Sequence, residues 1–363
     1  MRYVIAFDSF KGSMTAVEAC ETARDVIGQL RPEADVTLLP MSDGGDGMLE
    51  AYAYGRRMEQ RWCNAHDALM RPCTAGYLVD GDRAIIESAQ ACGLLRVKDE
   101  PLRPLQATSY GVGELVADAI RHKCRHLVVG LGGSACSDSG IGMLQALKEQ
   151  LLRMKGIWQH QLRTWDDVPL PDGLDITLAC DVNNPLYGER GAAAVFGPQK
   201  GATADDIRLL DRKARTFAAL SERHLGHDCS QLPGAGAAGG LGYAFMQYLG
   251  ARPQPGAGLM LALSRFDEAA KGAVCILTGE GAADRQTLMG KMPSAVLRHG
   301  RELGVPVVLL AGRVADREAL LQAGFDRVEA ITPESMTPEE AMRKDVAKKN
   351  LKKTVEKLIY SVL

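Results

Sequence analysis

The stretch "AVCILTGEGAADRQTLMGKMP", residues 273–293, decides the fold predicted for this chain. It begins with a continuous apolar run, a pattern typical of a strand covered on both faces, as in the parallel sheets of α/β proteins. Buried strands usually end in a short turn. This one ends in Glu280, Asp284, a Gln-Thr pair and a Gly-Lys pair, groups that can hold a metal and a phosphate. The stretch therefore predicts half of an active site.

Similar apolar runs that end at Gly or Asp recur along the chain. They are "RYVIAFD" at 2–8, "DVTLLPMSDGG" at 35–45, "HLVVGLGG" at 126–133, "VPVVLLAGR" at 305–313 and "RVEAIT" at 327–332. Helical patterns lie between them, and the helix after Thr15 has Glu18 three residues on, which predicts a capping box. Strands that alternate with helices predict an α/β fold with a doubly wound parallel sheet.

Two segments break this rhythm and predict a second domain, inserted twice into the first. "AGYLVDGDRAIIESA", 75–89, indicates a β-hairpin, and 147–266 is irregular and rich in Gly and Pro. The expected boundaries are 1–57, 105–145 and 268–363 for the first domain, and 58–104 and 146–267 for the inserted one. We expect a ligand in the cleft between two such domains.

Composition and charge narrow the class of partner. The chain has 363 residues, a size typical of two domains, and a formal net charge of -2. This balance argues against nucleic acid and anionic lipid as partners and favours a small molecule. We expect a cytoplasmic protein, because the N-terminal stretch lacks a leader pattern and no apolar run is long enough for a membrane span. The nine cysteines include no C-x-x-C pair, which predicts reduced thiols.

Two glycine-rich stretches fail the nucleotide-loop patterns that they resemble. "PGAGAAGGLG", 233–242, has G-x-G-x-x-G spacing, but no strand precedes it, so it predicts either an anion-binding loop or a tight chain reversal. Around Lys291 the Walker A pattern fails, because Arg285 and Met292 replace its first Gly and its Ser or Thr. Lys291 with Glu280 and Asp284 still offers a cation for phosphate and carboxylates for Mg²⁺; the alternative is a salt-bridged surface loop.

Polar residues follow several other predicted strands. Asp8 and Lys11 lie in "FDSFKGSMT", and Asp43 lies in "SDGGDG". "LGGSACSDSG", 131–140, is either a nucleotide cradle or a strand-to-helix turn capped by Ser137 or Asp138. Asp181 and Asn183 can bind a metal or a hydroxyl, or cap a turn. Ligands of open parallel sheets bind beyond the carboxyl ends of strands, so we expect these loops to converge. No histidine lies in them, which leaves His-based catalysis without support.

Taken together, these motifs resemble the bacterial glycerate kinase family, the glyoxylate- and glucarate-linked type, along nearly the whole chain. The matching stretches are "DSFKGSMTA", "SDGGDG", "SYGVGEL", "GLGGSACSDSG", "DVNNPLYGERGA", "VFGPQKGA", "PGAGAAGGLG", "GEGAADRQT" and "GKMP". The resemblance implies a flavodoxin-like domain with an inserted second α/β domain, and ATP-dependent phosphorylation of D-glycerate, at the 2-hydroxyl. Two positions depart from the family pattern: Ser139 replaces a Gly and Ala282 replaces an Arg.

The resulting hypothesis is in-line attack of a glycerate hydroxyl on the γ-phosphate of ATP. Asp8 or Asp43 would be the base and Lys11 and Ser9 would hold the substrate carboxylate. The predicted site is catalytic Asp8, Lys11 and Asp43; substrate-binding Ser9, Asp181 and Asn183; nucleotide-binding or phosphate-binding Gly132, Gly133, Ser134, Asp138, Gly279, Gly281 and Lys291; and Mg²⁺-binding Glu280 and Asp284.

Other functions remain open at this point. The loss of an arginine at 282 leaves a non-catalytic sugar-acid sensor as an alternative, beside a kinase of a related hydroxy acid or of the 3-hydroxyl of glycerate. An NAD-dependent oxidoreductase rests only on the weak "GAGAAG" match. The sequence does not indicate the oligomeric state.

Overall fold

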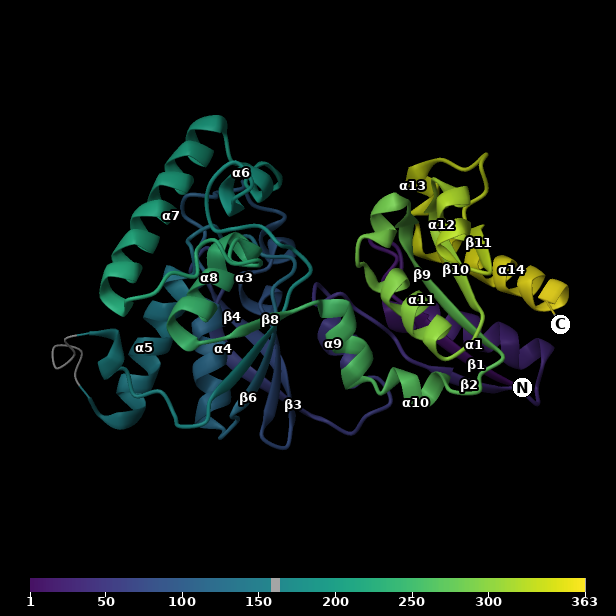
Figure 1. Cartoon of the computed structure of the whole chain (residues 1–363), viewed down its shortest axis with the longest axis horizontal. Helices are drawn as coiled ribbons and strands as arrows, with labels where there is room; N and C mark the ends of the chain where they lie inside the picture. Colours follow the sequence, from purple (N-terminus) through teal and green to yellow (C-terminus); the bar gives the residue numbers. More distant parts are fainter. Residues whose placement is uncertain (158–163, 363) are drawn as a thin grey trace. The chain divides into compact units, whose positions relative to one another are not determined.

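The computed structural model describes residues 1–157 and 164–362, and the chain forms two compact units (Figure 1). Unit 1 consists of Met1–Asp43, Glu50–Arg56 and Pro255–Leu363, and unit 2 of Gly44–Leu49 and Arg57–Gln254. Residues 158–163 and 363, which the predicted domains include, lie outside the described residues. The chain passes from unit 1 into unit 2 between Asp43 and Gly44, inside the "SDGGDG" stretch.

Unit 1 contains a five-stranded, fully parallel sheet in the order β11-β10-β9-β1-β2. Its strands are β1 (Arg2–Phe7), β2 (Asp35–Leu38), β9 (Cys275–Ala283), β10 (Val307–Val314) and β11 (Arg327–Ala330). Counted from β2, this is the 2-1-3-4-5 order of flavodoxin-like sheets, in which the strand order reverses between β1 and β9. The predicted parallel sheet of an α/β fold is confirmed, and the opening stretch supplies its central strand.

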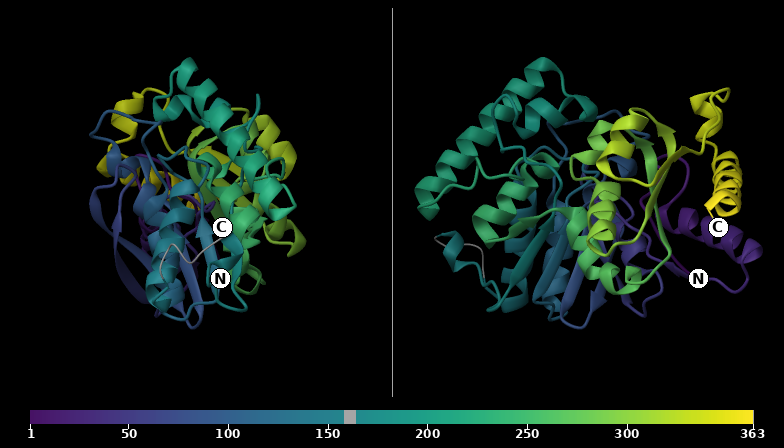
Figure 2. Two further views of the ribbon diagram at one scale, coloured as in Figure 1. Left: turned by 90° about the vertical axis from the view of Figure 1, so that its left-hand side faces the viewer. Right: turned by 45° about the vertical axis from the view of Figure 1, so that its right-hand side comes forward.

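Helices cover both faces of this sheet. They are α1 (Ala16–Leu30), α2 (Met48–Ala53), α9 (Gly256–Leu263), α10 (Phe266–Ala270), α11 (Met292–Glu302), α12 (Arg317–Ala323), α13 (Pro338–Ala341) and α14 (Lys344–Val362), with the 3₁₀ helix η5 (Arg285–Leu288). The terminal helix α14 packs beside α1, as the right-hand view of Figure 2 shows in yellow and purple. Both bury apolar side chains against Ile5 and Leu310, whereas α11 contacts β9 and β10. The capping box of Thr15 and Glu18 is confirmed.

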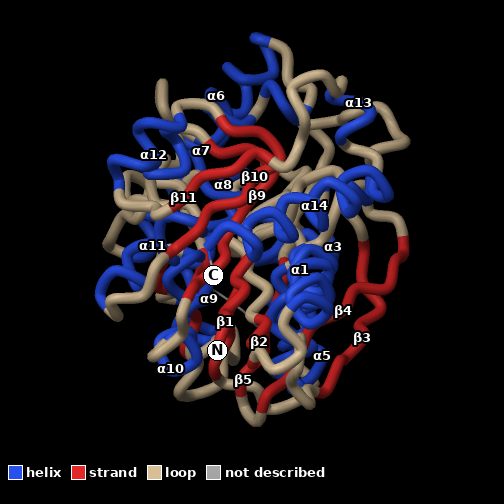
Figure 3. Tube along the Cα trace, turned by 90° about the vertical axis from the view of Figure 1, so that its right-hand side faces the viewer, coloured by secondary structure: helices blue, strands red, loops and turns tan. Residues whose placement is uncertain are grey.

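Unit 2 contains a six-stranded mixed sheet in the order β3-β4-β5-β6-β7-β8. Its strands are β3 (Glu59–His66), β4 (Pro72–Asp80), β5 (Arg83–Glu87), β6 (His126–Gly130), β7 (Asp175–Ala179) and β8 (Arg252–Gln254). The predicted hairpin is confirmed as β4 and β5, with Asp80 opposite Arg83. A longer hairpin of β3 and β4 extends it (Figure 3). From β5 to β8 the strands are parallel.

Helices surround the sheet of unit 2, and apolar side chains of helices and strands form a large buried core. They are α3 (Ala89–Cys92), α4 (Tyr110–Arg121), α5 (Ile141–Lys155), α6 (Ala192–Phe196), α7 (Ala204–Leu225) and α8 (Ala237–Leu249), with 3₁₀ helices η1 (Leu94–Val97), η3 (Trp165–Asp167) and η4 (Pro198–Lys200). Six of the nine cysteines are buried. Among the described residues, none of the helices combines the length and apolarity needed to cross a bilayer.

The division into units differs from the predicted one mainly in segment 105–145, and also in two shorter segments: 44–49 lies in unit 2 and 255–267 in unit 1. We expected 105–145 in the first domain, but this segment lies in unit 2, where β6 pairs with β5 on one side and β7 on the other. The reason is that a continuous apolar run such as "HLVVG" indicates a strand covered on both faces without indicating which parallel sheet it joins. Residues 105–145 therefore belong to the inserted unit.

Candidate active site

Two buried carboxylates meet where the strand order of unit 1 reverses. Asp8 directly follows β1, and its backbone N–H donates to the carbonyl of Gly279 in β9 at 2.9 Å. Glu280 is the next residue of β9, and Asp8 and Glu280 are each only 8% exposed. Ligands of open α/β sheets bind at such a reversal, beyond the carboxyl ends of the strands. The fold thus brings together Asp8, Gly279 and Glu280, three of the predicted site residues.

The negatively charged groups of this cluster repel one another. Burial, with the negative charges of Asp43 and Glu280, raises the pKa of Asp8 to about 7, although the Ser9 amide and Lys11 act in the opposite direction. Burial also raises the pKa of Glu280. Like charges at close range disfavour ionisation. Asp8 therefore exchanges its proton near neutral pH, as a general base requires.

Glu280 is held by residues of the loop that follows β9. The Thr287 hydroxyl donates to its Oε1 at 2.6 Å, and Lys291 Nζ lies 3.6 Å from Oε2. Thr287 is itself fixed, because its Oγ1 accepts the Asp284 N–H at 3.0 Å. No role was predicted for Thr287, although the spacing of Asp284 and Thr287 is that of a capping box.

Asp284, predicted as a Mg²⁺ ligand, caps the 3₁₀ helix η5, and its Oδ1 accepts the Gln286 N–H at 2.7 Å. In the part of the chain that the structure describes, no group of three His, Cys, Asp or Glu side chains is placed to hold a metal ion. The assignment of Glu280 and Asp284 to magnesium stays a prediction.

In unit 2, the glycines of the 131–140 loop allow another part of the chain to approach closely. A Cβ on Gly132 would lie 2.3 Å from the Cα of Gly45, and one on Gly133 would lie 2.3 Å from Asp46 Oδ1. Gly133 also has a φ of +72°, which favours glycine. The small residues predicted to cradle a nucleotide thus accommodate the 44–47 segment.

Asp138, predicted to bind nucleotide, organises the start of two helices. Its Oδ2 accepts hydrogen bonds from Thr108 Oγ1 and from both N and Oγ of Ser109, and its two oxygens accept the N–H groups of Gly140 and Gly142. This set of donors matches the alternative interpretation, in which Asp138 caps a strand-to-helix turn. By accepting these hydrogen bonds, the Asp138 carboxylate links the starts of α4 and α5.

Two buried charged side chains of unit 2 had no role in the sequence-based site. Glu87 ends β5, its Oε1 accepts the Gly47 N–H at 2.8 Å, and burial raises its pKa to about 7. Lys200 is 3% exposed, and its ammonium donates to Ser134 Oγ at 3.2 Å and to the Cys136 carbonyl at 2.5 Å. Burial lowers the pKa of Lys200. Lys200 lies in the "VFGPQKGA" stretch and Glu87 in the predicted hairpin, but the sequence did not indicate that both side chains are buried.

The remaining motifs of unit 2 fall into two groups. Asp181 and Asn183 lie exposed on the loop after β7. The "PGAGAAGGLG" stretch packs against the 131–140 loop, since a Cβ on Gly239 would lie 2.1 Å from the Cys136 carbonyl. This contact favours the tight chain reversal over the anion-binding loop.

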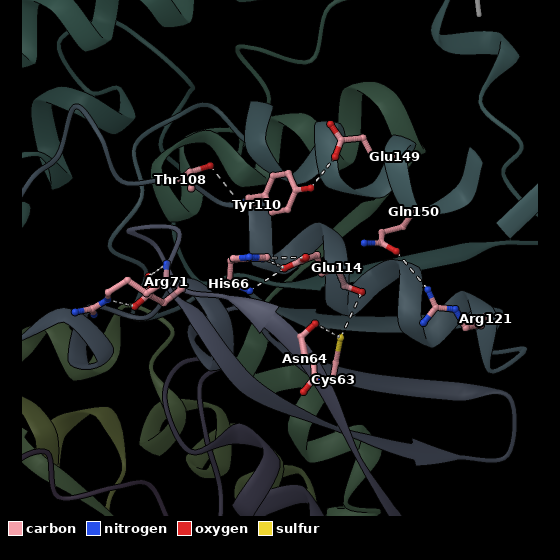
Figure 4. Close-up of polar contacts among 11 residues, drawn as sticks. Cys63, Asn64, His66, Arg71, Thr108, Tyr110, Glu114, Arg121, Glu149 and Gln150 are labelled. Atoms are coloured by element: carbon pink, nitrogen blue, oxygen red, sulfur yellow. Dashed lines mark hydrogen bonds and ion pairs between the residues drawn. The ribbon is translucent and has the colours of Figure 1, made fainter. Parts of the chain in front are cut away.

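The "SYGVGEL" motif forms the first turns of α4 and anchors the end of β3 (Figure 4). The Glu114 carboxylate accepts the backbone N–H of His66 at 2.8 Å, and its Oε1 lies 3.0 Å from Nδ1 of that histidine. The Tyr110 hydroxyl donates to Glu149 at 2.7 Å, linking α4 to α5. These contacts join β3, α4 and α5, which gives the motif a structural task.

Comparison with known proteins agrees with this fold. Residues 3–363 match the sequence profile of the glycerate kinase family. The chain is 39% identical over 355 residues to the glycerate kinase of Halalkalibacterium halodurans, covering 94% of this chain and 93% of that protein. It is 35% identical over 357 residues to the glycerate 2-kinase of Escherichia coli K12, with coverage of 94% and 93%. The crystal structure of a protein assigned as glycerate kinase 2 of Salmonella typhimurium LT2 superposes with a TM-score of 0.81 at 32% identity, covering 100% of this chain and 98% of that one.

These matches identify the protein as a phosphotransferase that uses an alcohol group as acceptor. Within that class, the chain belongs to the glycerate kinase family.

Proposed function

We propose that this enzyme phosphorylates D-glycerate with ATP, at the 2-hydroxyl, to give 2-phosphoglycerate. The observation that carries the proposal is the buried cluster of Asp8 and Glu280 at the strand-order reversal, with the pKa of Asp8 raised to about 7. The E. coli relative is named glycerate 2-kinase, which supports the choice of hydroxyl.

In the proposed mechanism, Asp8 accepts the proton of the attacking hydroxyl. A base with a pKa near the working pH is the most effective, which favours Asp8 for this role. Burial and, after it, the charge of Asp43 keep the pKa of Asp8 high. Lys11, whose charge also acts on Asp8, and Ser9 bind the substrate carboxylate. Proton removal then coincides with attack on the γ-phosphate, so catalysis consists mainly of positioning and charge neutralisation.

Phosphoryl transfer also needs cations around the transferred group. Lys291 lies 3.6 Å from Glu280 and is the lysine that we assign to the transferred phosphate. Mg²⁺ binds through one or two carboxylates together with substrate phosphates and water. The mutual repulsion of Asp8, Asp43 and Glu280 fits a site that gains a cation. We propose Glu280 as its protein ligand, and Asp284 as the less suited of the two predicted residues because it caps η5. When bound, the ion would neutralise charge on the phosphates.

Product analysis tests the proposal directly. The protein is incubated with ATP, Mg²⁺ and D-glycerate, ADP is measured, and the product is identified by ³¹P and ¹³C NMR, with L-glycerate as the matched control. We expect ADP formation with D-glycerate only and phosphorus coupled to C2. Coupling to C3 would assign the 3-hydroxyl instead. Binding of glycerate without ADP formation would favour the sensor, the function suggested by Ala282.

A further inference from the structure

Unit 1 contains a cavity of about 650 Å³ at the carboxyl ends of its strands. Its lining includes Gly281 of β9, Gly312 of β10, Ile331 after β11, and residues of and around α13. Small-molecule sites typically measure about 300–1,000 Å³. A three-carbon hydroxy acid would leave most of this volume empty, so the cavity is suited to a larger ligand.

The walls of the cavity combine two kinds of chemistry. Pro333, Met336 and Met342 form an apolar side, and methionine side chains adapt readily to flat, polarisable groups. Three cations, Lys11, Arg313 and Arg317, also line it, against one acid, Glu334. An apolar wall with an excess of positive charge complements a ligand that has an aromatic end and an anionic end.

The cavity is continuous with the candidate active site through two shared residues. Lys11 lines the cavity, and its charge also lowers the pKa of Asp8. Gly281, which follows Glu280, lines it as well, and a Cβ there would lie 3.2 Å from the backbone nitrogen of Lys11. The anionic end of a ligand bound here would therefore lie beside the reacting carboxylate.

We propose that this cavity binds the adenine nucleotide, with the base against the side formed by Pro333, Met336 and Met342 and the phosphates toward Lys11. The inference rests on the proposed function, since a nucleotide is needed as phosphoryl donor. It differs from the nucleotide cradle expected at 132–138, where the space beside Gly132 and Gly133 is filled by Gly45 and Asp46. In unit 2 the 44–47 segment packs against the 131–140 loop and fills this space. The cavity of unit 1, in contrast, has room for a ligand.

Substitution of Met342 tests the proposal, because this side chain is 53% exposed and its replacement should leave the fold intact. Met342→Glu adds a carboxylate to the apolar wall and should weaken ADP binding, measured by isothermal titration calorimetry, at least about 10-fold, because it loses apolar contact and repels phosphate. The KM for ATP should rise by a similar factor, with the KM for glycerate unchanged. Met342→Leu keeps the wall apolar and should bind ADP within about twofold of wild type.

The matched control is Val274→Glu, which adds the same charge at the opposite, amino end of β9, where the side chain is 40% exposed. It should leave ADP binding unchanged. Unaltered ADP affinity in Met342→Glu, or a raised KM for glycerate in its place, would overturn the inference. A wild-type protein that binds ADP through Met342 but does not phosphorylate glycerate would support the inference while removing the proposed function.

Discussion

In both units, polar and glycine-rich segments follow the ends of parallel strands, but the surroundings of these segments differ. In unit 1 the strand ends carry Asp8 and Glu280, buried beside each other with raised pKa values, and an open cavity adjoins them. In unit 2 the strand ends carry Glu87 and the 131–140 loop, whose polar groups and glycines are engaged by other parts of the chain. Both units therefore bury a carboxylate whose pKa is raised to about 7. The carboxylates of unit 1 adjoin a cavity, which points to chemistry there, whereas Glu87 accepts a main-chain N–H, which points to a structural role.

The largest effect should come from removing the base in unit 1. Asp8→Asn keeps the shape of the side chain but cannot accept the hydroxyl proton, so we expect kcat to fall about 10²- to 10⁴-fold. Wild-type kcat should rise with pH through about 7, because Asp8 must be ionised to act and its pKa is about 7. Steady-state kinetics across pH 5–9 measure both effects.

Asp25→Asn, an exposed change on α1, serves as the control and should keep full activity. Comparison with Asp43→Asn decides between the two candidate bases, because the base should show the larger loss of kcat. Full activity in Asp8→Asn would exclude Asp8 from this role.

In unit 2 the corresponding carboxylate, Asp138, should affect stability. Asp138→Ala removes an acceptor used by Thr108, Ser109, Gly140 and Gly142. Hydrogen bonds to a charged group contribute about 1.5–3 kcal/mol each, so the free energy of unfolding should fall by at least about 3 kcal/mol. Urea denaturation measures this loss.

The control for Asp138→Ala is Asp172→Ala, at an exposed turn, which should change the free energy of unfolding by no more than about 0.5 kcal/mol. A stable Asp138→Ala protein with weakened nucleotide binding would instead restore the cradle interpretation of the 131–140 loop.

Glu87 of unit 2 should make the stability of the folded protein depend on pH. Burial in the folded protein raises the pKa of Glu87 from its usual 4.5 to about 7, so folding disfavours the ionised form. The wild-type protein therefore keeps its full stability below about pH 4.5 and loses stability, relative to Glu87→Gln, as the pH rises through 7. At about 1.4 kcal/mol per tenfold change in proton affinity, the difference should approach about 3 kcal/mol above pH 7.

Urea denaturation of wild type and Glu87→Gln at pH 5 and pH 8 checks this prediction. A difference between the two proteins that is the same at both pH values would mean that Glu87 does not titrate in this range in the folded protein.

Periodicity and strand-end chemistry predicted most of the fold and the core of the site in unit 1. The apolar runs identified all five strands of its sheet, and the reversal between β1 and β9 then joins Asp8 to Glu280. The sheet to which β6 belongs was beyond prediction, because burial on both faces is common to all parallel strands. The strand β3 (Glu59–His66) was missed because its alternation is irregular and includes charged residues.

The contacts of the glycines and of the buried charged side chains were also beyond prediction, but for a different reason. A glycine indicates that something approaches the backbone closely, but not whether it is a ligand or another segment, and at Gly132 it is Gly45. Likewise, no role was predicted for Lys200, because only tertiary packing places its ammonium on Ser134 and Cys136.

The smallest expected effect concerns Ser139, which replaces a glycine of the family pattern and has a φ of 57°. A side chain in the left-handed region costs about 1–2 kcal/mol, partly offset by the greater freedom of glycine in the unfolded chain. Ser139→Gly should therefore raise the free energy of unfolding by about 0.5–1 kcal/mol, measured by urea denaturation. The neighbouring change Ser137→Gly, at a position without a positive φ, should lower it. Because Ser139 lies in the unit whose loops hold one another, the gain in stability should leave kcat unchanged; a change in kcat would show that this loop takes part in catalysis.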